Sequence, residues 1–420
     1  MTAPVPLPEP LRAPGQISMA DQPFEPRATV CLGLVGCGRR GRTLLEAFRE
    51  TEGVAVVALA DLRPEALAQA DPDGTATAHV GEGAGEALCA RGDLDLVVIA
   101  TPWGLHASQA RHAMLHGAHV AVDVPLATTL PELWDLVDTS ERTRRHCVLL
   151  ENCSYMPTEL AVLAMAREGL FGDLMHGEAA YCHDLREILF TRAEGLWWRP
   201  QHQARNGNLY PTHGLGPVAT CLDLLRGDTF EALVSMGTAE RGLSAFRDTL
   251  PEGDARRQER YACGDLNTSI LRTAKGRTLT LQYDVVSPRP YDRGGGLFGT
   301  KGCFRDDPAR FAFEGEGPLR WRERPDLLDR FGHPGWAGRP FWATADAGPE
   351  EKHWTNRIMA DRLVRAMRLG GVPDIDVYDG ATWSAPGPLS EASLAAGGSA
   401  VAFPDFSRGA WTQKRLRPFA

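Results

Sequence analysis

Short apolar runs alternate with helical patterns through the first 150 residues. The runs expected to be strands are Thr29–Val35, Val54–Ala60, Leu94–Ala100 and Ala118–Val122. The segments expected to be helices are Thr43–Glu50, Pro64–Ala70 and Leu105–His116, and a Gly-rich loop is expected before residue 94. Strands that are almost uniformly apolar and that alternate with helices indicate a parallel sheet covered on both faces. We therefore expect an α/β, doubly wound domain over residues 27–150.

The hydrophobic rhythm changes from residue 151 onward. Longer segments with partial alternation predict strands at Gly177–Cys182, Ala232–Met236, Thr268–Arg272 and Thr278–Val285. Helices are predicted at Glu159–Glu168, Gly216–Leu225 and Trp354–Leu369. Residues 286–350 are rich in Gly, Pro and Asp and predict loops, and an irregular tail is expected at the end. Residues 151–420 are thus expected to form an α+β, substrate-binding domain around an open and mainly antiparallel sheet.

Composition narrows the classes of function. The net charge of −9 argues against a nucleic-acid partner, and no apolar run is long enough for a membrane span. The first 26 residues hold seven prolines and no signal-like core, so they predict a disordered arm or one that lies on the surface. The nine cysteines are scattered and include no C-x-x-C pair, which predicts free thiols. Together these features favour a cytoplasmic protein.

A glycine motif follows the first apolar run directly. Gly36, Gly38 and Gly41 form G-x-G-x-x-G at the start of a predicted helix, which is the context that a dinucleotide site requires. The first glycine allows the tight turn, the second lets the backbone approach a diphosphate, and the third permits close helix–strand packing. The diphosphate is expected at the helix N-terminus, where Arg39 and Arg40 add positive charge.

The second strand predicts which dinucleotide is bound. Asp61 lies at its tip, twenty positions after Gly41, and can accept hydrogen bonds from a ribose diol. Its carboxylate would repel a 2′-phosphate, so NAD is favoured over NADP, although Arg63 weakens this preference. Further cofactor contacts are expected after the third strand, at Thr101, Pro102, Trp103 and His106. For the two aromatic residues, ordinary loop packing is the alternative.

The densest polar and aromatic stretch of the chain is Arg205–Pro217. It offers a phenol, Tyr210, and an imidazole, His213, three positions apart. Near a nicotinamide such a pair can move protons at neutral pH. A capping or core role for His213 is the alternative on the residues alone.

These motifs together resemble the Gfo/Idh/MocA oxidoreductase superfamily and, more narrowly, glycoside hydrolase family 109, the NAD-dependent N-acetylgalactosaminidases. The resemblance spans roughly residues 29–411. The matching residues include Asp123-Val124-Pro125, Glu151–Tyr155, His176–Glu178, Tyr181 with His183–Arg186, Asn206–Val218, Gly264–Thr268, Ser287–Tyr291, Gly299–Gly302 and Phe403–Trp411. Tyr-Pro-Thr-His-Gly-Leu-Gly-Pro, from Tyr210, is the most specific string among them.

The resemblance implies hydrolysis through transient oxidation. A hydride leaves C3 of the sugar for NAD, the C2 proton is removed, the aglycone leaves C1, water adds, and the hydride returns. Such chemistry lies outside the two-carboxylate scheme of most glycosidases. Because the cofactor is regenerated in each turnover, we expect it to be held tightly. No metal is expected, since the histidines and acids lack the spacing of a zinc site.

The resemblance also assigns roles to individual residues. His213 is expected to be the base at the C3 hydroxyl. Proton transfer at C2 and to the leaving group is expected from Tyr210, Tyr155 or Tyr291, with no basis for ranking them. Substrate contacts are expected from Asp123, Arg199, Tyr181 and His183, and cofactor contacts from Asp123 and Asn152. Since a phenol needs a cationic neighbour to act as a base near pH 7, Arg199 is expected to supply that charge.

Departures from related sequences bear on specificity. Superfamily dehydrogenases carry a lysine and an aspartate where this chain has Val124 and Leu209, and family 109 shares the missing lysine. Glu351–Asn356 replaces a Gly-His-Gly-Gly-Met-Asp stretch of that family, with His353 as its retained histidine. The alternatives are a net NAD-dependent oxidoreductase of sugars, aminosugars or cyclitols and a non-catalytic NAD sensor. Homo-oligomer formation through the open face of the second sheet is left open.

Overall fold

The computed structural model describes residues 9–338, 349–416 and 419. Its first half is a six-stranded parallel sheet in the order β3-β2-β1-β4-β5-β6. The strands are β1 (Val30–Val35), β2 (Val54–Asp61), β3 (Thr77–Val80), β4 (Leu96–Ile99), β5 (His119–Val122) and β6 (Cys147–Leu149). This is the Rossmann strand order, in which ligands bind beyond the carboxyl ends of the strands where the order reverses, between β1 and β4.

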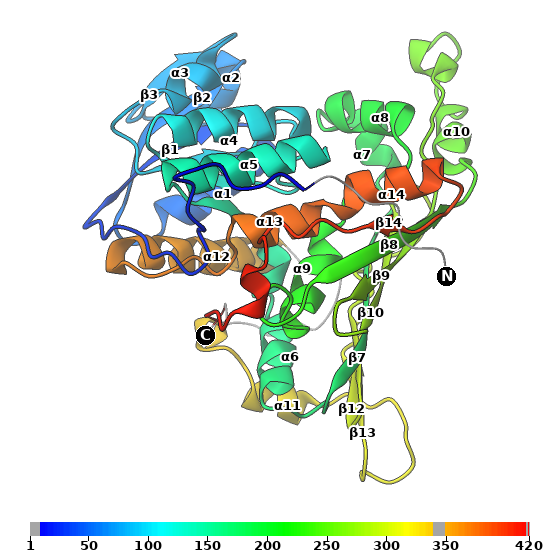
Figure 1. Cartoon of the computed structure of the whole chain (residues 1–420). Coiled ribbons are helices and arrows are strands. Elements are labelled where there is room, and N and C mark those ends of the chain that lie inside the picture. Colours follow the sequence, from blue (N-terminus) through cyan, green and yellow to red (C-terminus); the bar gives the residue numbers. More distant parts are fainter. Residues whose placement is uncertain (1–8, 339–348, 417–418, 420) are drawn as a thin grey trace.

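Helices cover this sheet, as Figure 1 shows in blue and cyan. They are α1 (Arg39–Arg49), α2 (Pro64–Ala70), α3 (Ala84–Cys89), α4 (His106–Leu115) and α5 (Leu130–Thr143). The loop expected before residue 94 is wrong in part, because β3 and α3 lie within it. All four residues of β3 are at least partly exposed, so this edge strand has no apolar run that would identify it.

The second half is built on an eight-stranded sheet in the order β13-β12-β11-β7-β10-β9-β8-β14. The strands are β7 (Leu174–Cys182), β8 (Phe230–Gly237), β9 (Asn267–Thr273), β10 (Thr278–Asp284), β11 (Gly296–Gly299), β12 (Gly302–Arg305), β13 (Arg310–Phe313) and β14 (Val401–Ala402). Only the β7–β10 pair is parallel among these described strands. The expected class, with a mainly antiparallel second sheet, is confirmed.

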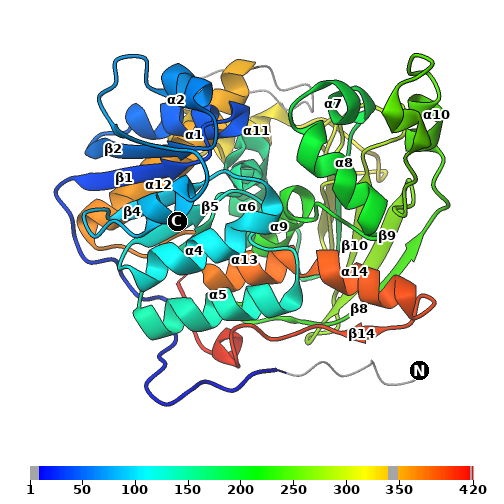
Figure 2. The same ribbon diagram turned by 90° about the horizontal axis from the view of Figure 1, so that it is seen from above.

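Helices pack on one face of this sheet, as the view in Figure 2 shows. They include α9 (Thr212–Cys221) on β7 and α14 (Pro386–Ala395) on β8, with α6 (Pro157–Arg167) beside α9. The predicted helix at Gly216–Leu225 therefore begins four residues earlier, at Thr212. Above one end of the sheet lie α7 (Arg186–Thr191), α8 (Gly195–Ala204) and α10 (Gly242–Arg247).

Two expectations for the second half are wrong. Residues 286–350 are not all loop, because β11, β12, β13 and α11 (Pro325–Arg330) lie among them. The tail is not irregular, because it forms α13 (Val377–Ser384) and α14. Every residue of α13 is buried, so no polar face marks its helical period.

The C-terminal part of the chain packs on the N-terminal half. The helix α12 (Pro349–Leu369) packs on α1, and α13 packs against α5 and β6. The described part of the N-terminal arm also lies on this surface: Arg12 donates to the buried Glu141 at 2.9 Å, and the Met19 amide donates to the Tyr378 hydroxyl at 2.8 Å. Residues 9–26 thus follow the second alternative for the arm, and residues 1–8 lie outside the described residues.

Two simpler expectations concern membrane spans and thiols. Of the described helices, none has the length and apolar character needed to traverse a bilayer. All nine cysteines belong to the described part of the chain, and each is a free thiol.

Two buried histidines in the first half predict acid sensitivity. Burial lowers the pKa of His119 to about 2 and that of His146 to about 4. In the unfolded chain both rings bind a proton below about pH 6.5, whereas in the folded chain they stay neutral. The free energy of unfolding should therefore fall as the pH drops below 6.5, by about 1.4 kcal/mol per pH unit for each ring, until about pH 4 for His146. Urea unfolding between pH 7 and 4.5 measures this loss.

A substitution tests the assignment. The His119 Nδ1 accepts a hydrogen bond from the His146 amide at 2.9 Å, and an asparagine oxygen can replace that acceptor. His119→Asn should reduce the acid-dependent loss by one histidine's share. The exposed His116 provides the control, since His116→Asn should leave the pH dependence unchanged. Equal pH dependence in His119→Asn and the unsubstituted protein would contradict the prediction.

Candidate functional site

The glycine motif forms the turn between β1 and α1. Gly36 has a φ of +92°, and a Cβ there would lie 2.5 Å from the Ala100 carbonyl oxygen. A Cβ on Gly41 would lie only 1.8 Å from the Gly36 oxygen, so α1 can approach the strand only because Gly41 has no side chain. A Cβ on Gly38, in contrast, would meet nothing within 4 Å. The open space beside Gly38, at the N-terminus of α1, fits the approach of a dinucleotide diphosphate.

The charged residues of this region are all engaged by the protein. Asp61 accepts from the Cys37 amide at 2.8 Å, so its carboxylate lies against the glycine turn, and it also accepts from the Arg63 amide. Arg39 pairs through Nε with Glu194 at 2.7 Å. Arg40 donates to Asp123 at 2.9 Å, and it also donates to the side-chain oxygens of Asn356 at 3.0 Å and Asn152 at 3.4 Å. Arg40 thus fixes the loops around the cofactor region to one another.

At the carboxyl edge of the sheet, the segment after β4 is bonded to the loop after β5. The two ring nitrogens of His106 lie 2.8 Å from the carbonyl oxygens of Thr101 and Pro125. The Thr101 hydroxyl donates to Gln109 at 2.8 Å. The ring of Trp103 stacks on Tyr210, with centroids 5.4 Å apart. Of the aromatic residues predicted here, His106 therefore holds the loops, and Trp103 faces the second half.

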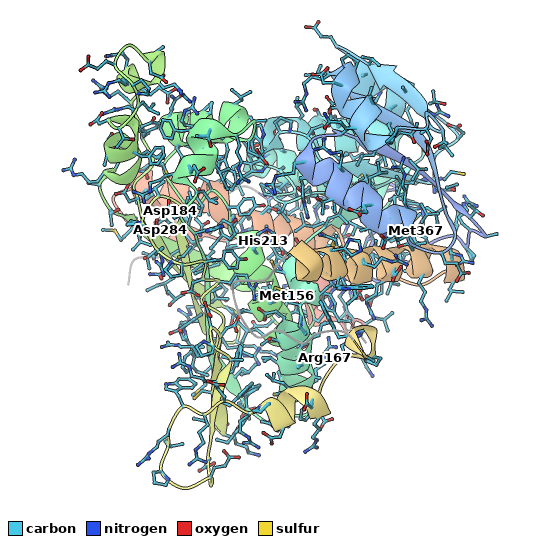
Figure 3. The ribbon with its side chains drawn as sticks, turned by 180° about the vertical axis from the view of Figure 1, so that it is seen from behind. Met156, Arg167, Asp184, His213, Asp284 and Met367 are labelled. Atoms are coloured by element: carbon cyan, nitrogen blue, oxygen red, sulfur yellow. The ribbon has the colours of Figure 1, made fainter. Side chains whose placement is uncertain are left out.

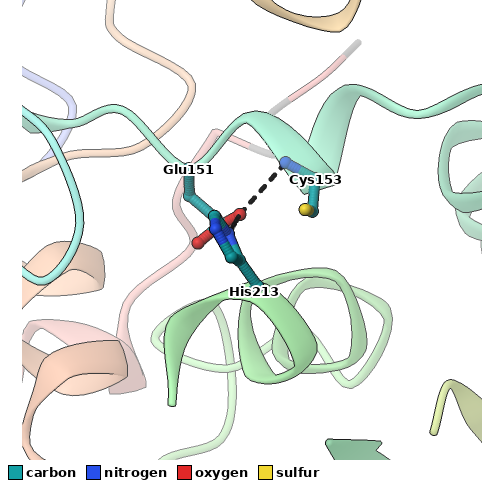
Figure 4. Close-up of side chains that lie close together, drawn as sticks. All are labelled: Glu151, Cys153 and His213. Carbon is teal, nitrogen blue, oxygen red and sulfur yellow. Dashed lines mark hydrogen bonds and ion pairs between the residues drawn. The ribbon is translucent and has the colours of Figure 1, made fainter. Parts of the chain in front are cut away.

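A histidine–carboxylate pair lies where the two halves meet. His213, in the first turn of α9, has its Nδ1 2.7 Å from Oε1 of the fully buried Glu151, which also accepts from the Cys153 amide (Figure 4). Figure 3 places His213 near the centre of the molecule. Burial raises the pKa of Glu151, but the pairing with His213 outweighs this and lowers it. Burial lowers the pKa of His213, but Cys153 and Glu151 raise it to about 10. The pair therefore favours the state in which the imidazole holds a proton.

Aromatic rings surround His213. Tyr210 meets its ring edge-on, with centroids 5.0 Å apart, and Tyr181 lies 5.5 Å away. Tyr291 contacts Tyr181 at 5.9 Å and His183 at 5.2 Å. Burial raises the pKa of Tyr210 and of Tyr291, opposed by Arg40 at Tyr210 and by Arg293 at Tyr291. The predicted residues Tyr181, His183, Tyr210, His213 and Tyr291 therefore form one cluster of phenols and imidazoles.

Two predicted residues lie outside this cluster. The Tyr155 hydroxyl donates to Asp374 at 3.3 Å, and its ring packs on Phe419. Arg199 forms an ion pair with Glu259 at 2.8 Å and donates to the Leu189 carbonyl. A carboxylate and a carbonyl oxygen therefore hold the guanidinium of Arg199 in this structure, and the role expected for it as the cation beside the phenols stays a prediction.

One group in the site offers donors suited to a metal. Glu151, Cys153 and His213 each present a ligand atom, and the three atoms lie within 4.8 Å of one another. Thiolate, imidazole and carboxylate are ligands that zinc accepts. The hydrogen bond between His213 Nδ1 and Glu151 already occupies part of this set. That the enzyme uses no metal stays a prediction.

The altered stretch before the last long helix contributes one residue to the site. Asn356 is buried, and its side-chain oxygen accepts from Arg40 at 3.0 Å. His353 instead pairs with Glu50, the residue after α1, at 3.1 Å. The side chains of Glu351 and Lys352 lie outside the described residues.

Sequence reasoning missed Glu151 and Arg293 as site residues. Glu151 had a usable signal, because it directly follows the apolar run of β6 at the carboxyl edge of the sheet, where ligands bind. Arg293 had none, since it lies in a segment expected to be loop. Its guanidinium lies 5.9 Å from the Tyr291 ring centroid and pairs with Glu159 at 2.9 Å.

Comparison with known families matches both halves of the chain. Residues 30–150 match the model of the oxidoreductase family with an NAD-binding Rossmann fold. Residues 155–413 match the model described as the C-terminal domain of glycosyl hydrolase 109. Residues 30–150 and residues 155–413 therefore have independent family matches.

Whole-chain relatives agree with these matches. A glycosyl hydrolase family 109 protein of Solibacter usitatus is 48% identical over 95% of this chain and 93% of its own length. An oxidoreductase domain protein from Kribbella flavida superposes with a TM-score of 0.71 at 19% identity, over 90% of this chain and all of that one. A levoglucosan dehydrogenase in complex with NADH and L-sorbose gives a TM-score of 0.71 at 20% identity, with the same coverage. The chain belongs to glycoside hydrolase family 109 and is an NAD-dependent glycoside hydrolase.

Proposed function

We propose that this enzyme cleaves N-acetylgalactosaminides or related glycosides by transient oxidation at C3 of the sugar. The observation that carries the proposal is the His213–Glu151 pair, which lies at the carboxyl edge of the NAD-binding sheet inside a cluster of phenols. A hydrolase of the two-carboxylate type has no need of this arrangement. An oxidation–elimination route needs a base at the C3 hydroxyl, a nicotinamide beside it and a second group that moves the C2 proton.

In this proposal the neutral form of His213 takes the proton of the C3 hydroxyl. Because Cys153 and Glu151 raise the pKa of the ring to about 10, only a minor fraction of the enzyme is in this form near pH 7, and cleavage should increase with pH. Glu151 accepts from Nδ1, so it stabilises the imidazolium and keeps the ring oriented. NAD bound at the glycine turn supplies a reversible acceptor for the C3 hydride. The same imidazolium returns its proton to the C3 oxygen when the ketone is reduced at the end of the turnover. No net oxidation results, and we expect the cofactor to be retained.

Proton transfer at C2 requires a second group. The C3 ketone acidifies the C2–H bond, and removal of that proton expels the aglycone from C1. Tyr210, Tyr181 and Tyr291 are the phenols in contact with the His213 cluster, and Arg40 and Arg293 lower the cost of ionising Tyr210 and Tyr291. Water then adds at C1 while C2 regains a proton. We assign C2 proton transfer to this group of phenols.

Cleavage in D2O tests the proposal. Purified enzyme is given nitrophenyl α- and β-N-acetylgalactosaminides, and nitrophenol release, deuterium at C2 and NADH are measured. Release with C2 deuterium and no net NADH is the expected result. Release without deuterium would overturn the elimination route, and accumulation of NADH would make the enzyme a net oxidoreductase. No release from either sugar would overturn the substrate assignment.

Tyr155 distinguishes the proposed cluster from its surroundings. Because the Tyr155 hydroxyl is bonded to Asp374 and not to the cluster, Tyr155→Phe should lose that one hydrogen bond, worth about 0.5–1.5 kcal/mol of stability. Its kcat should stay within about threefold of the unsubstituted enzyme, since a factor of three is less than 1 kcal/mol of barrier. Of Tyr210→Phe, Tyr181→Phe and Tyr291→Phe, measured in parallel on the same substrate, at least one should lose C2 exchange. A larger loss of kcat in Tyr155→Phe than in all three would return Tyr155 to the site.

A further inference from the structure

The helix α8 reaches from the second half of the chain toward the cofactor loop of the first. Glu194, at the N-terminal end of α8, forms an ion pair with Arg39 in the glycine motif. Trp197 and Trp198, both in α8, pack edge-on against Trp103 with centroids 5.2 Å and 5.1 Å away. One short helix thus contacts the loops after β1 and after β4, on either side of the point where the strand order reverses.

Contact between α8 and α7 fixes the position of Glu194. A Cβ on Gly195 would lie 2.0 Å from the Leu189 carbonyl oxygen, so α8 starts in close contact with the end of α7. The guanidinium of Arg199 donates to the same carbonyl and pairs with Glu259. These contacts hold Glu194 in place at the start of α8. Burial raises the pKa of Glu194, but Arg39 outweighs this and the carboxyl is held below its ordinary pKa.

Arg39 keeps donors for a second partner. Within the described part of the chain, the side chain of Arg39 donates to Glu194 through Nε, which leaves the terminal N–H groups for another acceptor. The neighbouring Gly38 borders the open space that fits a diphosphate. A guanidinium can bind a carboxylate through one edge and a phosphate through another, because its donors lie in a fixed planar fork.

We propose that Arg39 bridges the diphosphate of NAD and Glu194, so that α8 closes over the cofactor loop and slows release of the dinucleotide. Glu194 is thereby a positioning residue that acts through Arg39. The inference rests on the proposed use of this loop by NAD, and it explains how an enzyme that regenerates its cofactor in every turnover can retain it. The test measures cofactor release directly, so it does not depend on which glycoside the enzyme cleaves.

Release is measured with NADH as the probe. Full-length enzyme is loaded with NADH, and the fall of its fluorescence is followed after addition of excess NAD+. An exposed ion pair is worth up to about a fivefold change in an equilibrium constant, so Glu194→Gln should release NADH about three to five times faster. Glu194→Arg, which places like charges together, should release it faster still. Glu187→Gln removes an exposed acid from the neighbouring α7 and should leave the rate unchanged.

A double substitution separates positioning from folding. In an Arg39→Gln background, Glu194→Gln should add no further increase in the release rate, because the group through which it acts is gone. The same increase in both backgrounds would show that Glu194 only supports α8 and would overturn the proposal. Slower release from Glu194→Gln would also overturn it, since Glu194 would then be drawing Arg39 away from the diphosphate. An unchanged rate in Glu194→Gln and Glu194→Arg would do the same.

Discussion

Replacement of His213 by alanine is expected to lower kcat for glycoside cleavage by about 10²–10⁴-fold, the range that a positioned general base contributes. The reason is geometric: His213 is the imidazole that Glu151 orients, and it lies in contact with the phenols Tyr210 and Tyr181. Deuterium exchange at C2 should be lost in parallel, because C2–H becomes acidic only after C3 is oxidised. Both are measured in the same D2O reaction.

Controls separate loss of the base from loss of the fold. His176→Ala removes a histidine of β7 whose Nδ1 bonds to Thr278 at 2.8 Å, away from the pair, and it should keep its activity. NADH binding should survive in His213→Ala. Glu151→Gln should give a smaller loss than His213→Ala, since an amide oxygen can still accept from Nδ1 but no longer stabilises the positive charge. Unimpaired C2 exchange in His213→Ala would contradict the proposed route.

The first half of the fold could be predicted because a pattern in the adjacent sequence marks most of its strands and helices. Strands buried on both faces, such as β4 and β5, appear in the sequence as continuous apolar runs. The glycine motif lies at the strand-to-helix turn, where each glycine has a distinct steric reason. An edge strand such as β3 lacks this signal, because its residues are exposed and pair on one side only.

The second half could be predicted only in part. The strands β11 and β12 are four residues long and carry Gly296, Gly299 and Gly302, which have no side chain to show alternation. These glycines are required by crowding: a Cβ on Gly302 would lie 2.3 Å from the ring of Phe313. The helix α13 is buried on all sides, so its sequence has no polar face. In both cases tertiary packing overrides the local pattern.

The site residues could be identified singly, but their partners could not. His213 and Glu151 are 62 positions apart, and Arg40 and Asn356 are 316 apart, so only the assembled halves bring them together. Arg199 shows the same difficulty. Its residue type suits a cation beside a phenol, but the sequence does not show that Glu259, 60 positions away, pairs with it. Ion pairs between distant segments therefore decide which charged residues remain available to a ligand.

Substitution of two glycines of one motif by alanine should impair cofactor binding in both cases but should lower stability in only one. Gly41→Ala forces a Cβ to within 1.8 Å of a backbone oxygen, so α1 must shift, and we expect a loss of about 1–3 kcal/mol in the free energy of unfolding together with loss of NAD binding. Gly38→Ala meets nothing within 4 Å and has a φ of −65°, so the protein should unfold at the same urea concentration as the unsubstituted chain. Its affinity for NADH should nevertheless fall, because the new methyl group occupies the space where the diphosphate approaches the backbone. Urea unfolding and NADH titration of both variants give the four values needed.

If Gly38→Ala bound NADH as tightly as the unsubstituted chain, the diphosphate would lie elsewhere. If Gly41→Ala were as stable as the unsubstituted chain, α1 would not pack against the turn. Stable folding with impaired binding in Gly38→Ala is the combination that a cofactor site at this turn requires, since a purely structural role for the motif would leave the NADH affinity of Gly38→Ala unchanged.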